Sequence, residues 1–335
     1  MASSKDNLQP GVGVDLGTMN FVSARKAGNK LVTNRIRDAF VDLPPDKKRF
    51  LKISNTSYVE LGGRLLVLGD SALDVANLFN EEVKRPMSGG VISAGELDAQ
   101  QVIGLMIREL LGKPLVEKEK CAFSIPAAAI DVPGSDITYH KTILAKILEE
   151  IGYTPIPSNE AQAIVLSECS KEQFSGLGIS YGAGMTNISL CYSAMSALEF
   201  SVGRGGDWVD NHAARAVNKT AGKMTAIKES GINVSNPEGR DAEAIALYIR
   251  TLIDYTIENI INHFHSAKNE LMVPKPIPIV VGGGTSLAGG FMDLFRARFE
   301  AHKSKFPIQV SEIRHAEDPL YAVATGLILA AQMDD

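Results

Sequence analysis

Apolar and polar positions alternate near the start of the chain in a pattern that predicts a β-hairpin. Val12 and Val14 lead an apolar strand, Asp15 and Gly17 interrupt it, and alternation resumes at Val22. Because a tight turn exposes backbone N–H groups, this turn could cradle phosphate oxygens. Asp15 would then be placed to hold a hydrated Mg²⁺ against those phosphates. Taken alone, the stretch fits an ordinary turn at least as well.

The same pattern recurs in the second half of the chain, over residues 177–191. An apolar strand leads into a glycine-rich turn, and a second strand follows. Residues 184–187 of this turn align with residues 17–20 of the first, which predicts a duplicated architecture. Two glycine turns that faced each other would clamp a polyphosphate from both sides.

Helical periodicity predicts most of the remaining elements. Apolar residues at helical spacing predict helices over 97–111, 143–151, 242–270, 291–299 and 320–332. Gly112 and Gly152 are expected to end the first two, and Asp318-Pro319 to begin the last. Short apolar runs predict buried strands over 121–126, 277–281 and 308–310.

The middle of the chain carries a helix start and an expected linker. Ser158 or Asn159 can cap a helix that runs from Glu160 to about Glu168. The preceding residues 155–158 hold two prolines and are expected to link the two halves.

The chain is therefore expected to form two α/β domains, each a mixed sheet flanked by helices. Domain I would take residues 1–157 and 318–335, and domain II residues 158–317. Polar, glycine-bearing or charged stretches predict a small subdomain inserted in each, at about 28–80 and about 213–245.

Composition narrows the classes of function. With 335 residues, 45% of them hydrophobic, the chain can bury a large core, and its length favours two domains. A net charge of −5 argues against direct nucleic-acid binding, which requires a basic face. The three cysteines form no close pair, which predicts neither a zinc cluster nor a disulfide framework and suits a reducing cytoplasm.

Neither end of the chain resembles a membrane anchor. Residues 1–10 are polar, residues 332–335 are polar and acidic, and no apolar run approaches about 18 residues. We therefore expect a cytoplasmic protein that does not bind a membrane directly.

Two more glycine motifs stand where backbone could approach a ligand. Gly205-Gly206 precedes a predicted helix with Asp207 as its N-cap, and a helix N-terminus attracts anions, although a plain loop is the commoner explanation. The run 282–284 follows a buried strand, and its missing side chains would let backbone pack on a flat ligand.

Five elements now stand in one order along the chain: the first hairpin, the helix at Glu160, the second hairpin, Gly205-Gly206 and the run 282–284. Singly, Asp15 fits a turn, and Glu160 fits a first-turn acid that suits the helix dipole. Together the order resembles the actin-like ATPase superfamily, which also contains sugar kinases and heat-shock chaperone ATPases. The resemblance covers nearly the whole chain.

Three shorter stretches are similar to the prokaryotic actins of the MreB, MamK and ParM type. They are residues 85–92, Ile227-Lys228-Glu229 and Asp318-Pro319-Leu320. The resemblance implies a two-domain actin-like ATPase fold, in which duplicated ribonuclease-H-like domains enclose a nucleotide cleft.

The resemblance also implies a role for each matching residue. Asp15 would hold Mg²⁺ through water, and Glu160 would orient the water that attacks the γ-phosphate. The residues expected to grip the phosphates of ATP or ADP are Gly17, Thr18, Met19, Asn20, Gly182, Ala183, Gly184, Met185 and Thr186. Those expected near the ribose and adenine are Gly205, Gly206, Asp207, Lys228, Glu229, Gly283, Gly284 and Thr285.

One position departs from the family pattern. Ser180 stands at the start of the second hairpin, where the family usually has an Asp. A carboxylate there would help to order the waters of the metal and the nucleophile, so its replacement predicts slow hydrolysis more than weak nucleotide binding.

Three functions follow from the resemblance. The first is a filament-forming protein that assembles head to tail with itself and uses ATP hydrolysis to control polymerisation, with an unknown cargo or adaptor. The second is a non-polymerising ATPase adaptor of the pilus-assembly or microcompartment type. The third, a small-molecule kinase, would require an acid as base for the acceptor hydroxyl, and the sequence offers no clear candidate.

Overall fold

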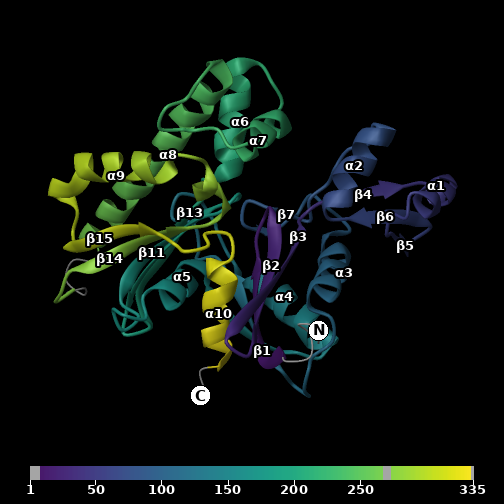
Figure 1. Ribbon diagram of the computed structural model, residues 1–335, viewed down its shortest axis with the longest axis horizontal. Helices are drawn as coiled ribbons and strands as arrows, with labels where there is room; N and C mark the ends of the chain where they lie inside the picture. The colour runs from purple at the N-terminus through teal and green to yellow at the C-terminus, as the bar shows by residue number, and fades with distance from the viewer. Residues whose placement is uncertain (1–7, 267–272, 333–335) are drawn as a thin grey trace.

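The computed structural model describes residues 8–266 and 273–332, and it contains two five-stranded sheets (Figure 1). The first sheet holds β1 (Leu8–Leu16), β2 (Asn20–Ala27), β3 (Lys30–Arg37), β9 (Lys120–Ile125) and β10 (Thr154–Asn159). The second holds β11 (Gly176–Tyr181), β12 (Thr186–Tyr192), β13 (Met195–Val202), β14 (Ile277–Gly282) and β15 (Val310–His315). The expected mixed α/β fold is confirmed.

The two sheets have the same strand order. In each, three antiparallel strands are followed by two parallel ones, in the orders β3-β2-β1-β9-β10 and β13-β12-β11-β14-β15. The duplication predicted from the two hairpins is therefore present throughout both sheets.

The register of the two hairpins corrects the alignment drawn from the sequence. Gly17 N donates to Asn20 O at 3.2 Å, and Gly182 N donates to Met185 O at 3.0 Å. Gly17 is therefore equivalent to Gly182 rather than to Gly184. By the same register Ser180 is the counterpart of Asp15.

Strand β1 is buried on both faces. Val12, Val14 and Leu16 lie in the core under one face of the first sheet. On the other face, a Cβ at Gly13 would overlap the carbonyl oxygen of Ala324, which explains why glycine interrupts the apolar run.

Two helices at the centre of the molecule each pack on the sheet formed by the other half of the chain (Figure 1). Helix α5 (Glu160–Glu168) follows the first sheet in the chain but packs on β11 and β12, whereas α10 (Ala322–Gln332) follows the second sheet but packs on β1 and β9. The two helices also pack on each other so closely that a Cβ at Gly326 would overlap the carbonyl oxygen of Ala163. Each sheet is thus covered by a helix that the other half of the chain supplies.

The outer helices cover the remaining faces. Helices α3 (Ala99–Leu111) and α4 (Thr138–Ile151) pack on the first sheet, and α8 (Arg240–Ser266) and α9 (Phe291–His302) pack on the second. Gly112 and Gly152 end α3 and α4 with positive φ angles of 67° and 108°, as the sequence predicted.

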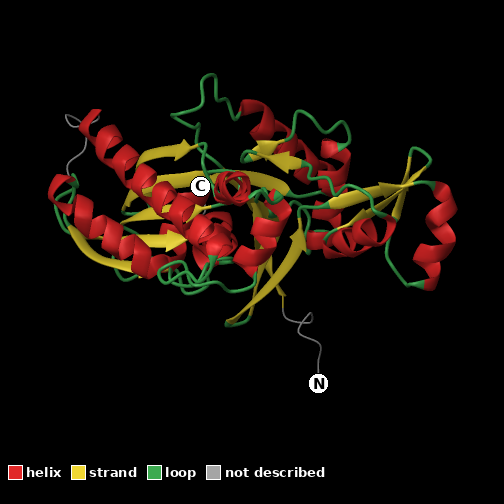
Figure 2. Cartoon of the chain, turned by 90° about the horizontal axis from the view of Figure 1, so that it is seen from above, coloured by secondary structure: helices red, strands yellow, loops and turns green. Residues whose placement is uncertain are grey.

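The insertions of the two halves differ in structure. The first holds β4 (Phe40–Leu43), β5 (Val59–Leu61), β6 (Arg64–Leu68), α1 (Lys48–Ile53) and α2 (Asp70–Phe79) around its own small core. The second is formed by α6 (Gly206–Val217) and α7 (Ala221–Glu229). From above, the small sheet lies at one end of the molecule and the long helices lie at the other (Figure 2).

Several boundaries differ from those predicted. β3 pairs with β2 along its whole length, so residues 30–37 belong to the main sheet and not to the small subdomain. The expected linker at 155–158 is strand β10, whose prolines are tolerated because β10 is an edge strand. The last strand and the last helix each begin two residues later than predicted, at Val310 and Ala322. The division of the chain into domains at 157/158 and 317/318 stays a prediction.

Two expectations meet the limits of the described residues. The end of the long helix predicted over 242–270 lies partly outside them, since 267–272 are not described. Within 8–266 and 273–332, no helix combines the length and apolar character needed to cross a membrane.

Candidate functional site

A cavity of about 310 Å³ opens where the turns of the two hairpins face each other. Most of the predicted site residues line it: Asp15, Gly17, Thr18, Met19, Asn20, Glu160, Gly182, Ala183, Gly184, Met185, Lys228, Glu229, Gly283, Gly284 and Thr285. Four predicted residues are not part of its lining: Thr186, Gly205, Gly206 and Asp207. Most of the residues predicted from the sequence therefore share one cavity. Four of them lie outside its lining.

The two hairpin turns meet through the short hairpin of β7 (Met87–Ser88) and β8 (Val91–Ile92). Gly90 N, in the turn between these strands, donates to Thr18 Oγ1 at 3.1 Å. A Cβ at Gly184 would lie 2.6 Å from the same Thr18 Oγ1, so only glycine allows the second turn to come this close. The two turns therefore approach each other closely, through the Thr18 hydroxyl and the backbone of Gly90 and Gly184.

Asp15 lies at the base of the first turn and is held by the neighbouring strand. Ser124 on β9 donates its hydroxyl to Asp15 Oδ1 at 2.8 Å and accepts from Leu16 N at 2.8 Å. Burial raises the pKa of Asp15 to about 6. A buried carboxylate of this kind favours a nearby cation.

Glu160 lies at the start of α5, close to Asp15. Asn159, one of the two caps that the sequence allowed, caps this helix by accepting from the backbone N–H groups of Ala161 and Gln162. Glu160 Oε2 accepts from Ser180 Oγ at 3.3 Å and from Asn187 Nδ2 at 3.0 Å. Burial, and secondarily the charge of Asp15, raises the pKa of Glu160 to about 8.

The acidic side chains of the cavity suit a magnesium ion that is bound by the protein and by the phosphates of a ligand together. Across the part of the chain that the structure describes, no group of three or more His, Cys, Asp or Glu side chains is placed to hold a metal ion. Mg²⁺ is commonly bound by one or two carboxylates together with substrate phosphates and water. Asp15, beside a turn that could hold phosphates, fits that pattern.

Helix α6 begins differently from the prediction. Gly205 is its N-cap, and Asp207 lies inside the first turn. Gly206 N donates to Gly182 O and Asp207 N to Ala183 O, each at 2.9 Å. Because these N–H groups bind the second hairpin turn, they are not free for an anion. A Cβ at Gly205 would lie 2.5 Å from Ala183 O, which is why a glycine stands there.

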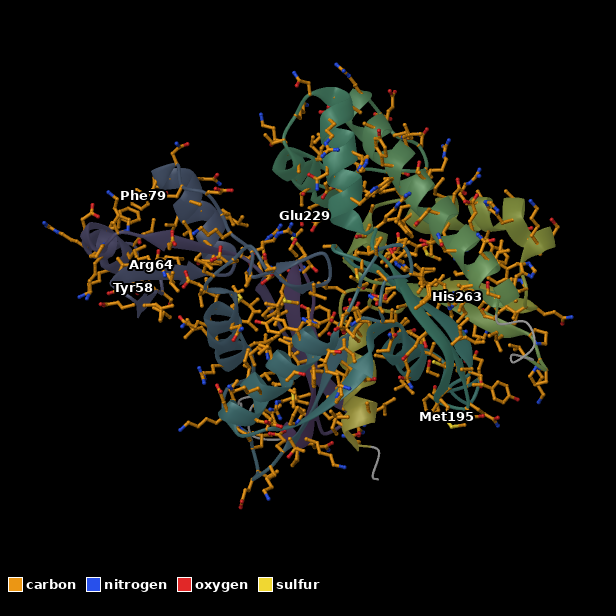
Figure 3. All side chains as sticks on the ribbon, turned by 180° about the vertical axis from the view of Figure 1, so that it is seen from behind. Tyr58, Arg64, Phe79, Met195, Glu229 and His263 are labelled. Atoms are coloured by element: carbon orange, nitrogen blue, oxygen red, sulfur yellow. The ribbon has the colours of Figure 1, made fainter. Side chains whose placement is uncertain are left out.

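Helix α7 closes one side of the cavity with two charged residues. Lys228 Nζ donates to both carboxylate oxygens of the buried Asp210 at 2.8 Å. Glu229 forms an ion pair with Arg37 on β3, 3.2 Å away in the other half of the molecule. Figure 3 shows Glu229 on the side of its lobe that faces the lobe carrying Tyr58, Arg64 and Phe79.

The triple glycine packs on the second hairpin. Gly283 has a φ of +89°, and a Cβ there would lie 2.5 Å from Tyr181 O. Thr285 Oγ1 donates to Gly182 O at 2.8 Å. The run after β14 therefore needs glycine for close packing as well as for access to the cavity.

Sequence reasoning missed other residues of the lining. They are Val22, Arg35, Arg37, Gly90, Asn187, Thr225, Gly231, Leu287, Ala288 and Leu320. Alternation along β3 would have placed Arg35 and Arg37 on one face, had residues 30–37 been assigned to the main sheet. Asn187 follows the second turn at a strand position, but nothing local in the sequence indicates that it reaches Glu160.

Nearly the whole chain is similar to a known protein family and to solved structures. A family model described as Volactin matches residues 11–331. No curated protein matches the sequence. Three solved structures are similar over nearly their full lengths, and at 15–18% identity they show the fold alone.

The first of these is the MamK double helical filament, with 18% identity, coverage of 97% of this chain and 99% of that chain, and a TM-score of 0.71. MreB5 of Spiroplasma citri bound to AMPPNP has 15% identity, coverage of 96% and 95%, and a TM-score of 0.67. The ethanolamine utilization protein EutJ from Carboxydothermus hydrogenoformans has 16% identity, coverage of 97% and 93%, and a TM-score of 0.55. The shared architecture is that of prokaryotic actin-like ATPases.

Proposed function

The chain belongs to the volactin family, an actin-like family, and we propose that it binds ATP or ADP with Mg²⁺ and hydrolyses ATP slowly to control its own polymerisation. In this proposal the protein is cytoplasmic and has a cytoskeletal or cytomotive role. Its subunits assemble head to tail, because a heterologous contact that does not close produces an open filament. MamK, similar over nearly the whole chain, forms a double helical filament.

One observation carries the nucleotide part of the proposal. Two equivalent glycine turns, from two sheets of identical strand order, face a single cavity with Asp15 and Glu160 at its base. Backbone N–H groups in such turns suit phosphate oxygens. MreB5 of Spiroplasma citri, which has this fold, has been solved with AMPPNP and with ADP.

Each side of the cavity would then take one part of the nucleotide. Residues 17–20 and 182–185 bind the phosphates, and Asp15 holds Mg²⁺ through water. Lys228 and Glu229 lie by the ribose, and residues 283–285 pack beside adenine. Mg²⁺, when bound, would neutralise phosphate charge beside the buried acids Asp15 and Glu160.

Glu160 orients the attacking water in this mechanism. Ser180 and Asn187 both donate to Oε2 of Glu160, which leaves Oε1 to accept from a water. Because phosphoryl transfer passes through a loose transition state, positioning matters more than a strong base. Ser180 supplies a hydroxyl where the family usually has a carboxylate, and we propose that turnover is slow for this reason.

A second function has a specific observation in its favour. EutJ is similar over 97% of this chain, so the fold is also found in an ethanolamine utilization protein. A non-polymerising ATPase adaptor is therefore the alternative. A small-molecule kinase is disfavoured because the acids that line the cavity, Asp15, Glu160 and Glu229, already have roles toward the metal, the water and the ribose.

The remaining partners are proposals of the same kind. With a net charge of −5, the protein is not expected to bind nucleic acid directly. Neither a direct membrane anchor nor a particular cargo is part of the proposal, and strong pelleting with lipid vesicles would contradict the first point.

High-speed pelleting with negative-stain microscopy tests the function, with and without ATP and Mg²⁺. We expect nucleotide-dependent filaments from the wild type and none from Asp15→Ala, with Asp293→Ala on the exposed face of α9 as the control. A soluble monomer that binds ATP under all conditions would favour the adaptor. A soluble protein that binds no nucleotide would refute both.

A further inference from the structure

Arg85 lies behind the two hairpin turns, in the segment that returns from the small subdomain to the main sheet. Its Nη2 donates to Asp207 Oδ2 at 2.9 Å and its Nη1 to Asp207 Oδ1 at 3.2 Å. Nη1 also lies 3.4 Å from the carbonyl oxygen of Thr18 in the first turn. One guanidinium therefore contacts the first turn and the first turn of α6 together.

Asp207 continues this series of contacts into the second hairpin turn. Its carboxylate binds Arg85, and its backbone N–H donates to Ala183 O at 2.9 Å. The series runs from Thr18 through Arg85 and Asp207 to Ala183. Neither Arg85 nor Asp207 lines the cavity, so these residues can affect it only through the two turns that they contact.

A second acid, Asp38, contacts both the first turn and the segment that carries Arg85. Asp38 is fully buried, its backbone N–H donates to Met19 O at 2.9 Å, and its Oδ2 accepts from Met87 N at 3.2 Å. Among the residues that the structure describes, its Oδ1 finds no hydrogen-bond partner. Burial raises the pKa of Asp38, and the positive charge of Arg85 opposes that rise.

We propose that Arg85 is a positioning residue that sets the spacing between the two phosphate-binding turns, and so favours a nucleoside triphosphate over a diphosphate. This inference rests on the nucleotide binding proposed above. A γ-phosphate would contact both turns at once, so its binding depends on their spacing. A diphosphate does not reach as far and depends on that spacing less.

The geometry requires arginine rather than any cation. A planar guanidinium can bind both oxygens of one carboxylate and still direct an N–H at a third acceptor. A lysine at this position would keep the charge but could not span Asp207 and Thr18 in the same way. Lysine substitution therefore separates geometry from charge.

The test compares the affinities for AMPPNP–Mg²⁺ and ADP–Mg²⁺ by titration calorimetry in wild type, Arg85→Lys and Asp207→Asn. We expect Arg85→Lys to lose about tenfold or more in AMPPNP affinity and less than about threefold in ADP affinity. Asp207→Asn keeps the backbone bond to Ala183 and is expected to change the ratio in the same direction by less.

Arg64→Lys is the matched control. Arg64 lies on β6 in the first insertion, where it forms ion pairs with Asp42 and Asp98. It contacts neither turn. Thermal unfolding of each variant shows whether it is folded.

The outcomes separate this inference from the proposed function. A wild type that binds neither nucleotide would overturn both. The wild type could bind nucleotide while Arg85→Lys and Asp207→Asn show the same AMPPNP-to-ADP affinity ratio as Arg64→Lys. That result would overturn the role of Arg85 and leave the proposed function intact. Equal losses for the two nucleotides would mean that the ion pair only stabilises the fold, which also contradicts the inference.

Discussion

The two halves of the molecule share a backbone and differ in the side chains placed at equivalent points. Asp15 in the first sheet lies beside Ser124 of the adjacent strand, and its counterpart Ser180 lies beside Gly282. Both turns keep the same backbone hydrogen bond and the same glycine at its donor. The backbone of the two turns is therefore alike, whereas the acidic side chain at this position is present in the first half alone.

The insertions show the same contrast at a larger scale. The first half inserts a three-stranded sheet with its own core, and the second inserts helices. Neither insertion alters the strand order of its parent sheet. The shared part therefore holds the two turns. Of the two insertions, within the described residues, only the second contributes to the lining of the cavity, through Thr225, Lys228 and Glu229.

The largest expected effect is a loss of stability on substitution of Gly13 or Gly178, where the two halves are most alike. A Cβ at either would overlap a helix carbonyl oxygen, that of Ala324 or of Ala161. Overpacking of this severity should cost about 3 kcal/mol or more in the free energy of unfolding. Urea denaturation of Gly13→Ala and Gly178→Ala measures it.

Gly222→Ala in α7 is the control, because no heavy atom of the described part of the chain lies within 4 Å of its added Cβ. We expect it to gain up to about 1 kcal/mol from helix propensity. If only one of the two buried glycines proved sensitive, the two helix–sheet contacts would not be equivalent.

The next effect concerns Glu160 in the first turn of α5, whereas the first turn of α10 in the other half holds no acidic residue. Glu160→Gln should lower ATP hydrolysis about 100-fold or more while nucleotide affinity changes little, since the amide cannot orient the water in the same way. Turnover and calorimetric titration with AMPPNP measure the two quantities. Unchanged turnover would contradict the role of Glu160.

The same substitution should stabilise the nucleotide-free protein. The folded-state pKa of Glu160 is raised to about 8 from 4.5, so the folded protein holds a proton that the unfolded chain releases. Stability therefore falls as pH rises from about 4.5 to 8. Glu160→Gln should remove that loss, which amounts to about 4 kcal/mol at pH 8, and the exposed Glu150→Gln should not.

A smaller effect separates the outer helices of the halves. Helix α4 buries His140, whereas the equivalent α9 buries only apolar side chains in its first turns. Burial lowers the pKa of His140 to about 4, so the unfolded chain binds a proton first as pH falls below about 6.5. Stability should then drop by about 2 kcal/mol between pH 6.5 and 5 from this group.

Urea unfolding at pH 7.5 and pH 5 checks this in wild type, His140→Gln and the exposed His265→Gln. His140→Gln should lose less stability on acidification than wild type, and His265→Gln should follow wild type. An identical loss in all three would contradict the assignment.

The smallest effect is expected from restoring symmetry at the turns. Ser180→Asp should hydrolyse ATP as fast as wild type or up to about tenfold faster, because a second carboxylate helps to order the metal's waters. Ser180→Ala separates the loss of the hydroxyl from the gain of the carboxylate. A clear slowing in Ser180→Asp would count against the equivalence of Ser180 and Asp15.

Local chemistry made most of the fold and much of the site predictable. The hairpins, the Asn159 cap and the glycine helix ends each depend on neighbouring residues, and the structure confirms them. Strand β10 was missed because two prolines indicate a linker unless the strand is known to lie at an edge. The partners Arg85–Asp207 and Arg37–Glu229 could not be predicted, since each joins residues more than a hundred positions apart.

The crossing of α5 and α10 has a consequence for synthesis on the ribosome. Val22 and Ala24 in the first sheet are buried against Ala324 and Ile328 of α10, the last helix that the structure describes. Translation at about 5–20 residues per second leaves that face bare for roughly ten seconds or more after the sheet can form. A nascent chain that stops before residue 322 therefore exposes its earliest strands, and such chains are the ones that chaperones should capture.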